Sequence, residues 1–479
     1  MGQNITSPRL KKFPVTCHTK HVRPGSTFVA IKGDKQDGVT YIPKAIKRGA
    51  SKIVMQYDAI VPPEIKQVIE QSEIEIELVE NTRLALAQLS EKASDYAHKQ
   101  LKIIGITGTK GKTSTAFILE HLLQSARHKT ALISTVHNKI GNKKFKSGLT
   151  TDQPDYLHQF FKTCVAHNIE YVVMEVAAQA LSLHRVAGIV FDAAVFTNFS
   201  QEHGEFYKTL DDYFAAKCTL FDQLKPDAPI FVNADDPWGK KILKQHPTFL
   251  SFAVENNNTH LSANIIDSKK ALAFKLQTPQ TTLSIHCPSL FGTFNTYNVL
   301  AALGVAQSIG IPPEQCAQQL QTFKGVPGRL QLHTLKNGAR CFIDYAHNPS
   351  SYKAVLSTLR NMTDDLIVVF GAGGKRDKEK RPIMGTIASE IADSVILTSD
   401  NPRTEDPEQI IQDIVSGVAP NNQHKIKKIV DRKIAIQQAC TMAKECSAIA
   451  LLGKGPDEYQ EKKGIKTKFS EKEIVKAYQ

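Results

Sequence analysis

The sequence contains no run of about 18 or more apolar residues, so no segment is expected to span a membrane. Its first residues, MGQNITSPRLKKF, include no apolar stretch of the kind found in a secretory signal. The eight cysteines are scattered and no CxxC pair occurs, which disfavours a zinc site or a disulfide framework. Together these absences predict a protein of the reducing cytoplasm.

The chain carries an excess of positive charge, with a formal net charge of +13. Such a charge favours either nucleic acid or a small polyanionic substrate such as a nucleotide. The basic residues are spread along the chain rather than gathered in an arm, and the densest patch, HKIKK at 424–428, has the apolar interleaving of a strand. The pattern therefore favours a small-molecule polyanion as the partner over nucleic acid.

At 479 residues the chain exceeds one ordinary core, and domains of about 100–200 residues predict two to four of them. We expect a small α/β unit over 1–98, a central unit over 99–328 and a second α/β repeat over 329–479. Strands that alternate with helices predict mainly parallel sheets covered on both faces. The short strands of the segment 259–290 predict an antiparallel insert.

The sharpest motif is GTKGKTS, which follows the apolar strand KIIGIT and precedes an amphipathic helical stretch. Glycines let backbone N–H groups approach phosphate oxygens, a helix start adds positive potential, a lysine adds a point charge, and a threonine can reach Mg²⁺. The spacing is GxxGKT rather than the strict GxxxxGK(S/T), and the alternative is a glycine-rich turn that only begins a helix. We predict a phosphate cradle made of Gly108, Thr109, Lys110, Gly111, Lys112, Thr113 and Ser114.

Two further polar residues follow predicted strands of the central unit. Glu175 ends the apolar strand YVVM, and His203 follows the strand AAVFTN in the same manner. Ligands of a parallel sheet gather at the carboxyl ends of its strands, and Mg²⁺ prefers oxygen ligands. Either residue alone is equally well explained as a surface residue, but beside the phosphate cradle both become candidate ligands of Mg²⁺ or of its water.

The order of motifs along the chain resembles that of the Mur ligases. GTKGKTS, MEV, TNFSQEH, YFAAK, VNADD, GTFNTYN, VPGR and DYAHNP occur in that order over nearly the whole chain. The segments PGSTFVAIKGDKQDG, GAGGKRDKEKRP, DNPR and GKG are similar to those of the branch that adds the third stem-peptide residue to UDP-MurNAc-L-Ala-D-Glu. The resemblance implies an N-terminal UDP-substrate-binding domain, a central ATP-binding domain and a C-terminal, Rossmann-like amino-acid-binding domain.

The resemblance also implies a function and its cofactors. We expect an ATP- and Mg²⁺-dependent, ADP-forming ligase of peptidoglycan precursor synthesis, acting in cell wall biogenesis and thereby in cell shape, division and the cell cycle. The substrate carboxylate would attack the γ-phosphate of ATP, and the amine would then attack the acyl phosphate. Such chemistry depends on positioning and electrostatics, so the lack of a Ser-His or Cys-His constellation is expected.

Roles in catalysis and in ATP and metal binding follow from the same resemblance. Lys217 matches the lysine that family members carbamylate with CO₂, whereas the local pattern alone favours a solvated helix residue. The implied metal ligands are Thr113, Glu175, His203 and Lys217, and the implied catalytic residues are Lys112, Lys217, His203 and Glu175. Further ATP contacts are implied for Asn295, Asn298, Arg329, Asp344 and His347.

The substrate-binding positions implied by the resemblance lie in all three domains. Arg403 belongs to the DNPR motif of members that select meso-diaminopimelate, because an arginine can clamp the second carboxylate of that substrate and lysine has no such group. The implied positions are Thr19, Thr150, Thr151, Arg185, Arg376, Asp400, Asn401, Arg403, Gly453 and Asp457. We expect a monomer whose partners are the UDP-MurNAc-dipeptide and the diamino acid.

Several substrate-facing positions depart from the family's pattern. The usual Glu-Val-Ser-Ser-His continues here as Ala177-Ala178-Gln179 after Glu175-Val176, and the usual Asp-Ser-Arg is His18-Thr19-Lys20. Two explanations remain open: drift with compensating contacts, or a ligase recruited to a different acceptor. The alternative function is a Mur-type ligase that uses L-lysine or another carboxylate acceptor. The rival functions are a folate-type ligase, a P-loop switch, which the lack of an NKxD motif disfavours, and a catalytically silent binding protein.

Overall fold

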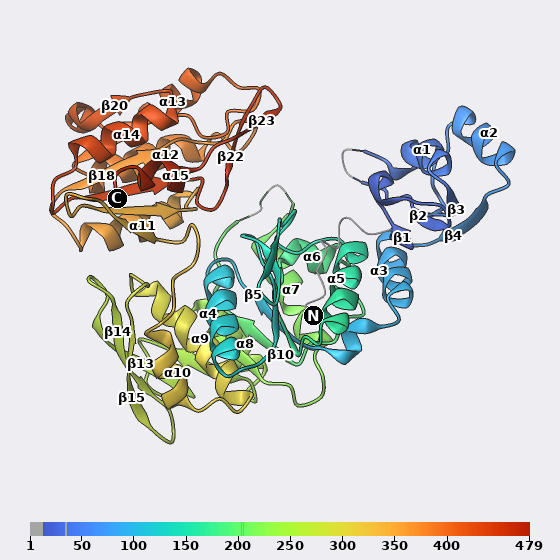
Figure 1. Ribbon diagram of the computed structural model, residues 1–479, viewed down its shortest axis with the longest axis horizontal. Helices are drawn as coiled ribbons and strands as arrows, with labels where there is room; N and C mark the ends of the chain where they lie inside the picture. Colours follow the sequence, from blue (N-terminus) through green and yellow to red (C-terminus); the bar gives the residue numbers. More distant parts are fainter. Residues whose placement is uncertain (1–12, 34–35, 203, 205) are drawn as a thin grey trace. The chain divides into compact units, whose positions relative to one another are not determined.

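The computed structural model describes residues 13–33, 36–202, 204 and 206–479, and it is α/β throughout (Figure 1). The chain forms two compact units. The first comprises Met1–Ser262 with Tyr297–Cys316, and the second comprises Ala263–Thr296 with Ala317–Gln479. The α/β class expected from the sequence is confirmed, whereas the domain borders at 98/99 and 328/329 stay predictions.

The first unit opens with a four-stranded, all-parallel sheet in the order β1-β2-β3-β4. Phe28 and Ile53 of this sheet pack with Ile42 of the first helix in a buried apolar cluster. The strands are β1 (Val15–Thr16), β2 (Ser26–Val29), β3 (Ala50–Gln56) and β4 (Glu75–Val79), and the helices are α1 (Ile42–Lys47), α2 (Pro63–Gln71) and α3 (Thr82–Ala93).

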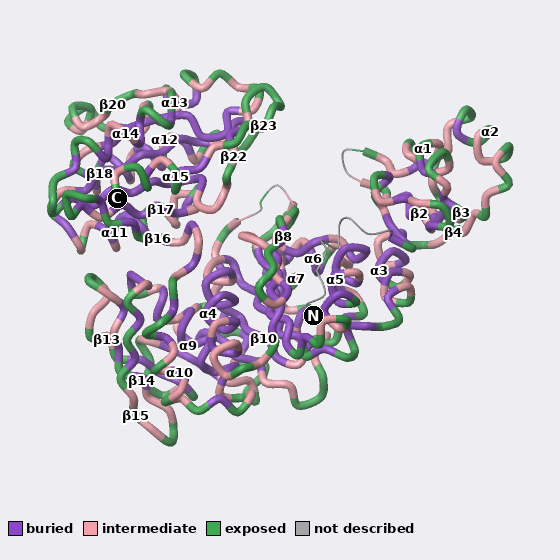
Figure 2. Tube along the Cα trace, in the orientation of Figure 1, coloured by how far each residue is buried: buried purple, intermediate pink, exposed green. Residues whose placement is uncertain are grey.

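The central sheet of the first unit has the order β12-β11-β10-β5-β9-β6-β7-β8, with a parallel core and an antiparallel β7–β8 hairpin at one edge. Every residue of β9, β10 and β11 is buried, as expected for parallel strands covered on both faces. Figure 2 shows the buried residues around β10. The strands are β5 (Lys102–Thr107), β6 (Thr130–Ile133), β7 (Asn138–Ile140), β8 (Lys143–Phe145), β9 (Tyr171–Glu175), β10 (Ala193–Phe196), β11 (Ile230–Asn233) and β12 (Leu250–Ala253).

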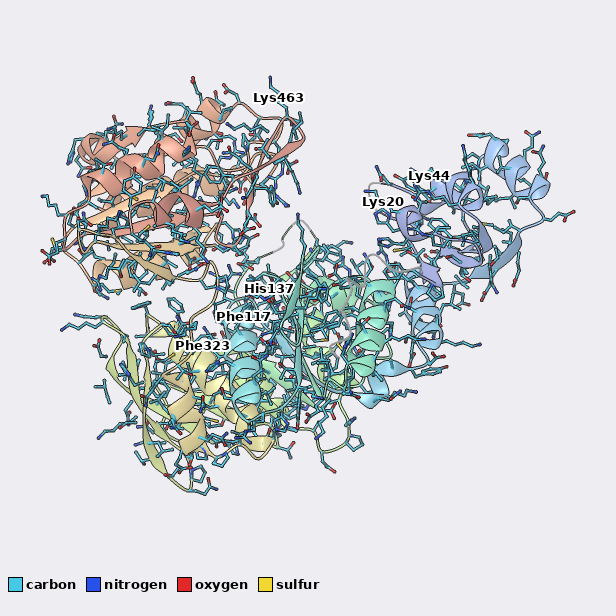
Figure 3. All side chains as sticks on the ribbon, viewed as in Figure 1. Lys20, Lys44, Phe117, His137, Phe323 and Lys463 are labelled. Carbon is cyan, nitrogen blue, oxygen red and sulfur yellow. The ribbon has the colours of Figure 1, made fainter. Side chains whose placement is uncertain are left out.

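Helices cover this sheet and carry part of the candidate site. Phe117 of α4 packs edge to face on His137, with ring centroids 5.3 Å apart, and burial lowers the pKa of His137 to about 4 (Figure 3). The neutral ring therefore belongs to the packing of α4. The helices are α4 (Lys112–Ser125), α5 (Pro154–Ala166), α6 (Ala178–Ser182), α7 (Leu210–Cys218), α8 (Pro237–Gln245), α9 (Phe294–Ser308), which runs into this unit from the second, and α10 (Pro313–Leu320).

The expectation of an antiparallel insert over 259–290 is half right. Strands β14 (Leu272–Gln277) and β15 (Thr282–Cys287) pair antiparallel. Strand β13 (Leu261–Asp267), in contrast, starts parallel to β12, with Phe252 opposite Leu261. The loop 254–260 returns the chain to the end from which β12 started, so the antiparallel arrangement begins only after β13.

The second unit contains a six-stranded sheet in the order β16-β17-β21-β18-β19-β20, parallel except for the edge strand β16. Consecutive strands such as β17 and β18 are separated by β21, and in open α/β sheets ligands bind at the carboxyl ends beside such a reversal. The strands are β16 (Gln331–Thr334), β17 (Arg340–Asp344), β18 (Leu366–Phe370), β19 (Ser394–Leu397), β20 (Ile426–Lys428) and β21 (Ala448–Leu452).

Helices and one hairpin complete this unit. The helices are α11 (Pro349–Arg360), α12 (Lys380–Ile391), α13 (Pro407–Val415), α14 (Arg432–Met442) and α15 (Glu471–Lys476). The hairpin consists of the antiparallel strands β22 (Tyr459–Lys462) and β23 (Ile465–Lys468). In the described part of the chain no helix combines the length and the apolar character needed to cross a membrane.

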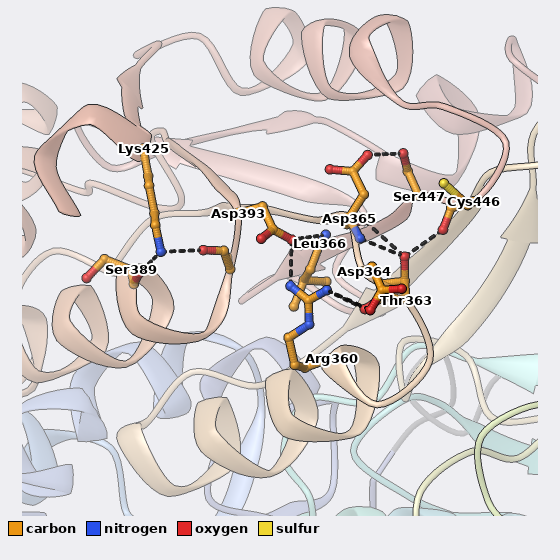
Figure 4. Close-up of polar contacts among 11 residues, drawn as sticks. Arg360, Thr363, Asp364, Asp365, Leu366, Ser389, Asp393, Lys425, Cys446 and Ser447 are labelled. Carbon is orange, nitrogen blue, oxygen red and sulfur yellow. Dashed lines mark hydrogen bonds and ion pairs between the residues drawn. The ribbon is translucent and has the colours of Figure 1, made fainter.

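A polar network fixes the amino ends of the strands in the second unit, opposite to the candidate site (Figure 4). Arg360 donates to Asp393, whose carboxylate also accepts the backbone N–H of Leu366 at 2.7 Å. The hydroxyl of Thr363 donates to the carbonyl of Cys446 at 2.6 Å. Because these bonds join the segments that lead into β18, β19 and β21, they hold the three strands in register and leave the carboxyl ends for other residues.

Candidate active site

The phosphate-cradle motif joins the end of β5 to the start of α4. Gly108 and Gly111 have φ values of 136° and 85°, a region that favours glycine. A Cβ on Gly108 would collide with the Thr197 hydroxyl, and one on Gly111 would collide with the amide oxygen of Asn298. Since α4 begins at Lys112, its first N–H groups lie at the loop. The local structure thus has the strand, tight loop and helix start that an anion needs.

Residues that follow β10 hold this loop from the neighbouring strand. The side chain of Asn198 accepts from the N–H of Lys110 at 2.9 Å and donates to its carbonyl at 3.1 Å. The hydroxyl of Thr197 donates to the same carbonyl at 2.6 Å. The loop is therefore shaped by the TNFS segment as well as by its own glycines.

Two lysines converge on one carbonyl oxygen of the loop. Lys112 Nζ and Lys217 Nζ each lie 2.8 Å from the oxygen of Gly108. The side chain of Lys217 is almost fully buried on α7, at 1% exposure, with its Nζ 4.4 Å from the centre of the Tyr213 ring. Burial first, and Lys112 second, hold the pKa of Lys217 well below its usual value. The local-pattern interpretation of Lys217 as a solvated helix residue is wrong, because α7 turns this position onto the loop.

Glu175 lies at the end of β9, next to β5, and is 1% exposed. Its carboxylate accepts the N–H of Thr135 at 2.8 Å and the hydroxyl of Thr135 at 3.1 Å. The Thr135 hydroxyl also lies 3.0 Å from that of Thr150. Thr113, in the first turn of α4, is buried too. These oxygen donors are of the kind that Mg²⁺ prefers.

His203, the other predicted ligand, lies outside the described residues. Over 13–33, 36–202, 204 and 206–479, no group of three or more His, Cys, Asp or Glu side chains is arranged to hold a metal. Thr113 and Lys217 are not among those residue types, so a mixed set of ligands stays a prediction.

Thr151 and Arg185, which are predicted to bind the nucleotide-linked substrate, form a chain of hydrogen bonds beside Glu175. The hydroxyl of Thr151 donates to the Glu175 carbonyl at 2.8 Å and accepts the N–H of Ala177 at 3.1 Å. Arg185 donates to the Thr151 carbonyl at 3.1 Å, and burial lowers the pKa of its guanidinium. Thr19 belongs to the N-terminal sheet region, where it is buried and its carbonyl accepts from Arg48 at 2.5 Å.

The predicted adenine-facing asparagines lie one turn apart on α9 and are both buried. Asn298 accepts from the hydroxyl of Thr115 at 3.4 Å and approaches Gly111 closely. Asn295 donates to the carbonyl of Phe291 at 2.7 Å. The structure therefore brings Asn298 to the phosphate cradle.

In the second unit, the end of β17 carries Asp344, whose carboxylate accepts the N–H groups of Leu330 at 2.6 Å and Ala346 at 2.7 Å. Burial raises the pKa of Asp344, while the nearby Arg329 opposes that shift. The Arg329 guanidinium lies 4.8 Å from the centre of the Tyr345 ring. His347 follows in the same turn, and its carbonyl accepts from Lys380 at 3.0 Å.

The predicted amino-acid pocket gathers loops that follow β18, β19 and β21. The loop after β19 contains Asp400, Asn401 and Arg403, and Arg403 Nη1 donates to the Gly374 carbonyl at 2.6 Å. Gly453 follows β21 with a φ of 106°, and a Cβ there would lie 2.7 Å from Asp400 Oδ2. These contacts confine the two loops to one corner of the sheet.

The remaining pocket candidates lie on the same loops. Arg376 is exposed on the segment after β18, and Asp457 follows Gly453 by one turn. Lys454, which the sequence prediction did not include, is fully buried, with its Nζ 3.5 Å from Asp400 Oδ1 and 3.3 Å from Asn401 Oδ1. Lys454 therefore ties the loop after β21 to the loop after β19.

Three family descriptions match the chain: the Mur ligase catalytic domain matches residues 14–99, the Mur ligase middle domain matches 106–306, and the Mur ligase glutamate ligase domain matches 328–455. A protein of Aquifex aeolicus (strain VF5), named UDP-N-acetylmuramoyl-L-alanyl-D-glutamate–2,6-diaminopimelate ligase, is 38% identical over 96% of this chain and 92% of its own length. A protein of the same name from Clostridium perfringens is also 38% identical, over 95% and 92%.

The chain belongs to the Mur ligase family. A solved structure of a protein with the same enzyme name superposes with a TM-score of 0.67 at 27% identity, covering 100% of this chain and 96% of the other. The three-domain α/β fold and the class of ATP-dependent, ADP-forming ligase expected from the sequence are thereby confirmed.

Four residues that position this Mur ligase's candidate site escaped the sequence prediction: Thr135, Thr197, Asn198 and Lys454. The last three lie inside the quoted motifs TNFSQEH and GKG, so the signal was present but was assigned to other members of each motif. Thr135 lies in no such motif. Only the pairing of β6 with β9 places it beside Glu175.

Proposed function

We propose that this Mur ligase joins meso-diaminopimelate to UDP-MurNAc-L-Ala-D-Glu with ATP, the activity for which its relatives are named. The observation that carries the choice of amine is the placement of Arg403. Its guanidinium is tethered to the Gly374 carbonyl within the predicted pocket, and its side chain is 25% exposed. An arginine in that position suits the second carboxylate of diaminopimelate, which lysine lacks.

The chemistry that this arrangement supports has two steps. The carboxylate of the nucleotide-linked substrate attacks the γ-phosphate of ATP, which gives an acyl phosphate and ADP. The amine then attacks the acyl carbon, and phosphate leaves as the amide bond forms. Lys112 and the N–H groups at the start of α4 stabilise the negative charge that develops on the phosphoryl oxygens.

The cofactor of this reaction is proposed to be Mg²⁺. The donors present fit it, because Glu175 offers a buried carboxylate that Thr135 holds in one orientation, and Thr113 offers a hydroxyl at the start of α4. Thr113, Glu175, His203 and Lys217 would hold the cation. When bound, Mg²⁺ supplies Lewis-acid stabilisation of the phosphoryl oxygens.

Lys217 is proposed to act as a carbamate. Its amine is buried, shares the Gly108 carbonyl with Lys112, and has a lowered pKa, so the neutral, nucleophilic form is favoured. The amine nitrogen would attack the carbon of CO₂ and lose a proton, which leaves a carboxylate-like group. The negative carbamate would attract the ammonium of Lys112, as the neutral amine does not, and it would add oxygen donors for the cation.

The other assignments are proposals of the same kind. Asn295, Asn298, Arg329, Asp344 and His347 are proposed to contact ATP, and Thr19, Thr150, Thr151 and Arg185 the nucleotide-linked acceptor. We propose that the enzyme acts in the cytoplasm, where its eight cysteines, all free thiols in the structure, would stay reduced. We also propose that it acts as a monomer. Its role would be in cell wall synthesis and thereby in cell division.

A competition reaction tests the proposed function. The purified protein, ATP, Mg²⁺, bicarbonate and UDP-MurNAc-L-Ala-D-Glu are mixed with equal amounts of meso-diaminopimelate and L-lysine, and the products are weighed by mass spectrometry. A diaminopimelate product is expected. A lysine product would keep the ligase but contradict the role of Arg403. Absence of any product from protein that binds ATP would point to a different acceptor and to the altered Ala177-Ala178-Gln179 segment.

A further inference from the structure

A buried carboxylate joins the N-terminal sheet to a helix that covers the central sheet. Asp155 lies in the first turn of α5 and is 4% exposed. Its Oδ2 accepts the hydroxyl of Thr16, which ends β1 and is fully buried, at 2.7 Å. Its Oδ1 accepts the N–H of Tyr156 at 2.9 Å. The bond between Thr16 and Asp155 thus links two segments that lie 139 residues apart in the sequence.

The same threonine hydroxyl organises the segment that follows β1. Thr16 Oγ1 accepts the N–H of His18 at 3.0 Å while it donates to Asp155. His18 is the N-cap of a short 3-10 helix that begins with the buried Thr19 and continues with Lys20, which Figure 3 labels. One carboxylate therefore fixes, through one hydroxyl, the backbone at the start of the His18-Thr19-Lys20 segment.

The first turn of α5 is in turn held together with the loop that precedes it. The side-chain amide of Asn138, on β7, donates to the buried carboxylate of Asp152 at 3.1 Å and to the hydroxyl of Tyr156 at 3.1 Å. Asp152 directly follows Thr150 and Thr151. Because the loop and the helix start share these bonds, a side chain fixed to Asp155 is also fixed relative to Thr151.

Two arginines face this joint from different segments. Burial raises the pKa of the Cys17 thiol well above its usual value and Asp155 adds to the rise, whereas Arg83 of α3 and Arg185 oppose it. Burial first, and Arg83 second, lower the pKa of Arg185, whose Nε is buried without a hydrogen-bond partner among the residues that the structure describes. Like charges gathered in this way favour an anion beside the joint.

We infer that Asp155 is a positioning residue for the nucleotide-linked acceptor, because through Thr16 it holds the His18-Thr19-Lys20 segment at a fixed distance from Thr151. This inference rests on the proposed function, in which Thr19 and Thr151 contact that acceptor. Without the bond, the acceptor itself would have to order the two segments when it binds, and this cost would weaken its binding. The chemical step and the binding of ATP and the diamino acid would stay as they are.

Variants at both ends of the bond test the inference. Thr16→Val keeps the shape of the side chain and removes the hydroxyl, and Asp155→Leu breaks the same bond from the other side. Each should raise the KM for UDP-MurNAc-L-Ala-D-Glu on the order of 10- to 100-fold, the range expected for a hydrogen bond to a charged group, with kcat and the other two KM values unchanged. The double variant should be no worse than either single one. Asp155→Asn keeps an oxygen that can accept the Thr16 hydroxyl and should stay close to the wild type.

Asp192→Asn is the control for a purely structural carboxylate. Asp192 accepts the N–H of Ile103 at 2.8 Å and so fixes the start of β5, away from the acceptor segments. Its loss should lower the melting temperature and leave all three KM values unchanged. Equal rises of all three KM values in Thr16→Val and Asp155→Leu would mean that their bond is only structural and would overturn the inference. An unchanged acceptor KM in either folded variant would overturn it as well. A wild-type enzyme that makes no product from UDP-MurNAc-L-Ala-D-Glu would overturn the proposed function, and the inference with it.

Discussion

Removal of the hydroxyl of Thr135 tests whether Glu175 is held for a cation. In Thr135→Val the side chain keeps its shape but loses the hydrogen bond of 3.1 Å to Glu175 Oε2, while the backbone N–H bond of 2.8 Å to Oε1 remains. One of two donors that orient the carboxylate is lost. A residue that orients a metal ligand is typically worth about 10- to 100-fold in metal affinity, so the Mg²⁺ concentration for half-maximal turnover should rise by about that factor.

The assay is the initial rate of ADP release as a function of free Mg²⁺, with ATP and both co-substrates saturating. Thr163→Val is the control, because that threonine is buried and its hydroxyl donates to the Gln159 carbonyl within α5, away from Glu175. Circular dichroism should show the same melting behaviour for both variants. An unchanged Mg²⁺ dependence in Thr135→Val, with the fold intact, would refute the assignment of Glu175 as a ligand.

Three further predictions concern separate parts of the chain. Lys217→Arg cannot form a carbamate, so bicarbonate should restore turnover to CO₂-depleted wild-type enzyme but not to this variant; equal restoration would contradict the modification. Gly111→Ala, at a φ of 85° and against Asn298, should abolish ATP binding measured by calorimetry without unfolding the protein. Burial lowers the pKa of His158 from 6.5 to about 3, so as pH falls the unfolded state binds the proton before the folded state does. The free energy of unfolding should therefore fall by about 1.4 kcal/mol per pH unit between pH 6.5 and 3 on account of this histidine. Chemical denaturation of His158→Leu should show a shallower loss of stability over that range.

The fold was predictable because its signals are local. Apolar strands such as KIIGIT, the glycine-rich loop and the alternation with helices are written in short segments, and β5, α4 and β9 form where these segments stand. The same locality explains one mistake. Whether β13 pairs parallel or antiparallel with β12 depends on the path of the loop 254–260, and the composition of the strand does not encode that path.

The candidate site likewise has parts that could be predicted from local sequence and parts that could not. The phosphate cradle could be predicted because a single loop supplies it. The roles of Lys217 and Thr135 could not be predicted from their own surroundings, since α7 places the amine on Gly108 and the pairing of β6 with β9 places the hydroxyl on Glu175. Lys217 entered the prediction only through the family resemblance, and Thr135 did not enter it at all.

The altered segment after Glu175 illustrates what the structure adds to that resemblance. The family's serine is Ala177 here, yet the backbone of this segment is still held, because the Thr151 hydroxyl bridges the Glu175 carbonyl and the Ala177 N–H. Arg185 in turn holds the Thr151 carbonyl. The shape of the segment therefore does not depend on a side-chain hydroxyl at position 177. An alanine in place of the serine would remove the contact to the acceptor that the resemblance implies, but the position of Glu175 does not depend on it. Drift and a changed acceptor would therefore differ in the KM for the nucleotide-linked substrate and not in the chemistry at the phosphate cradle.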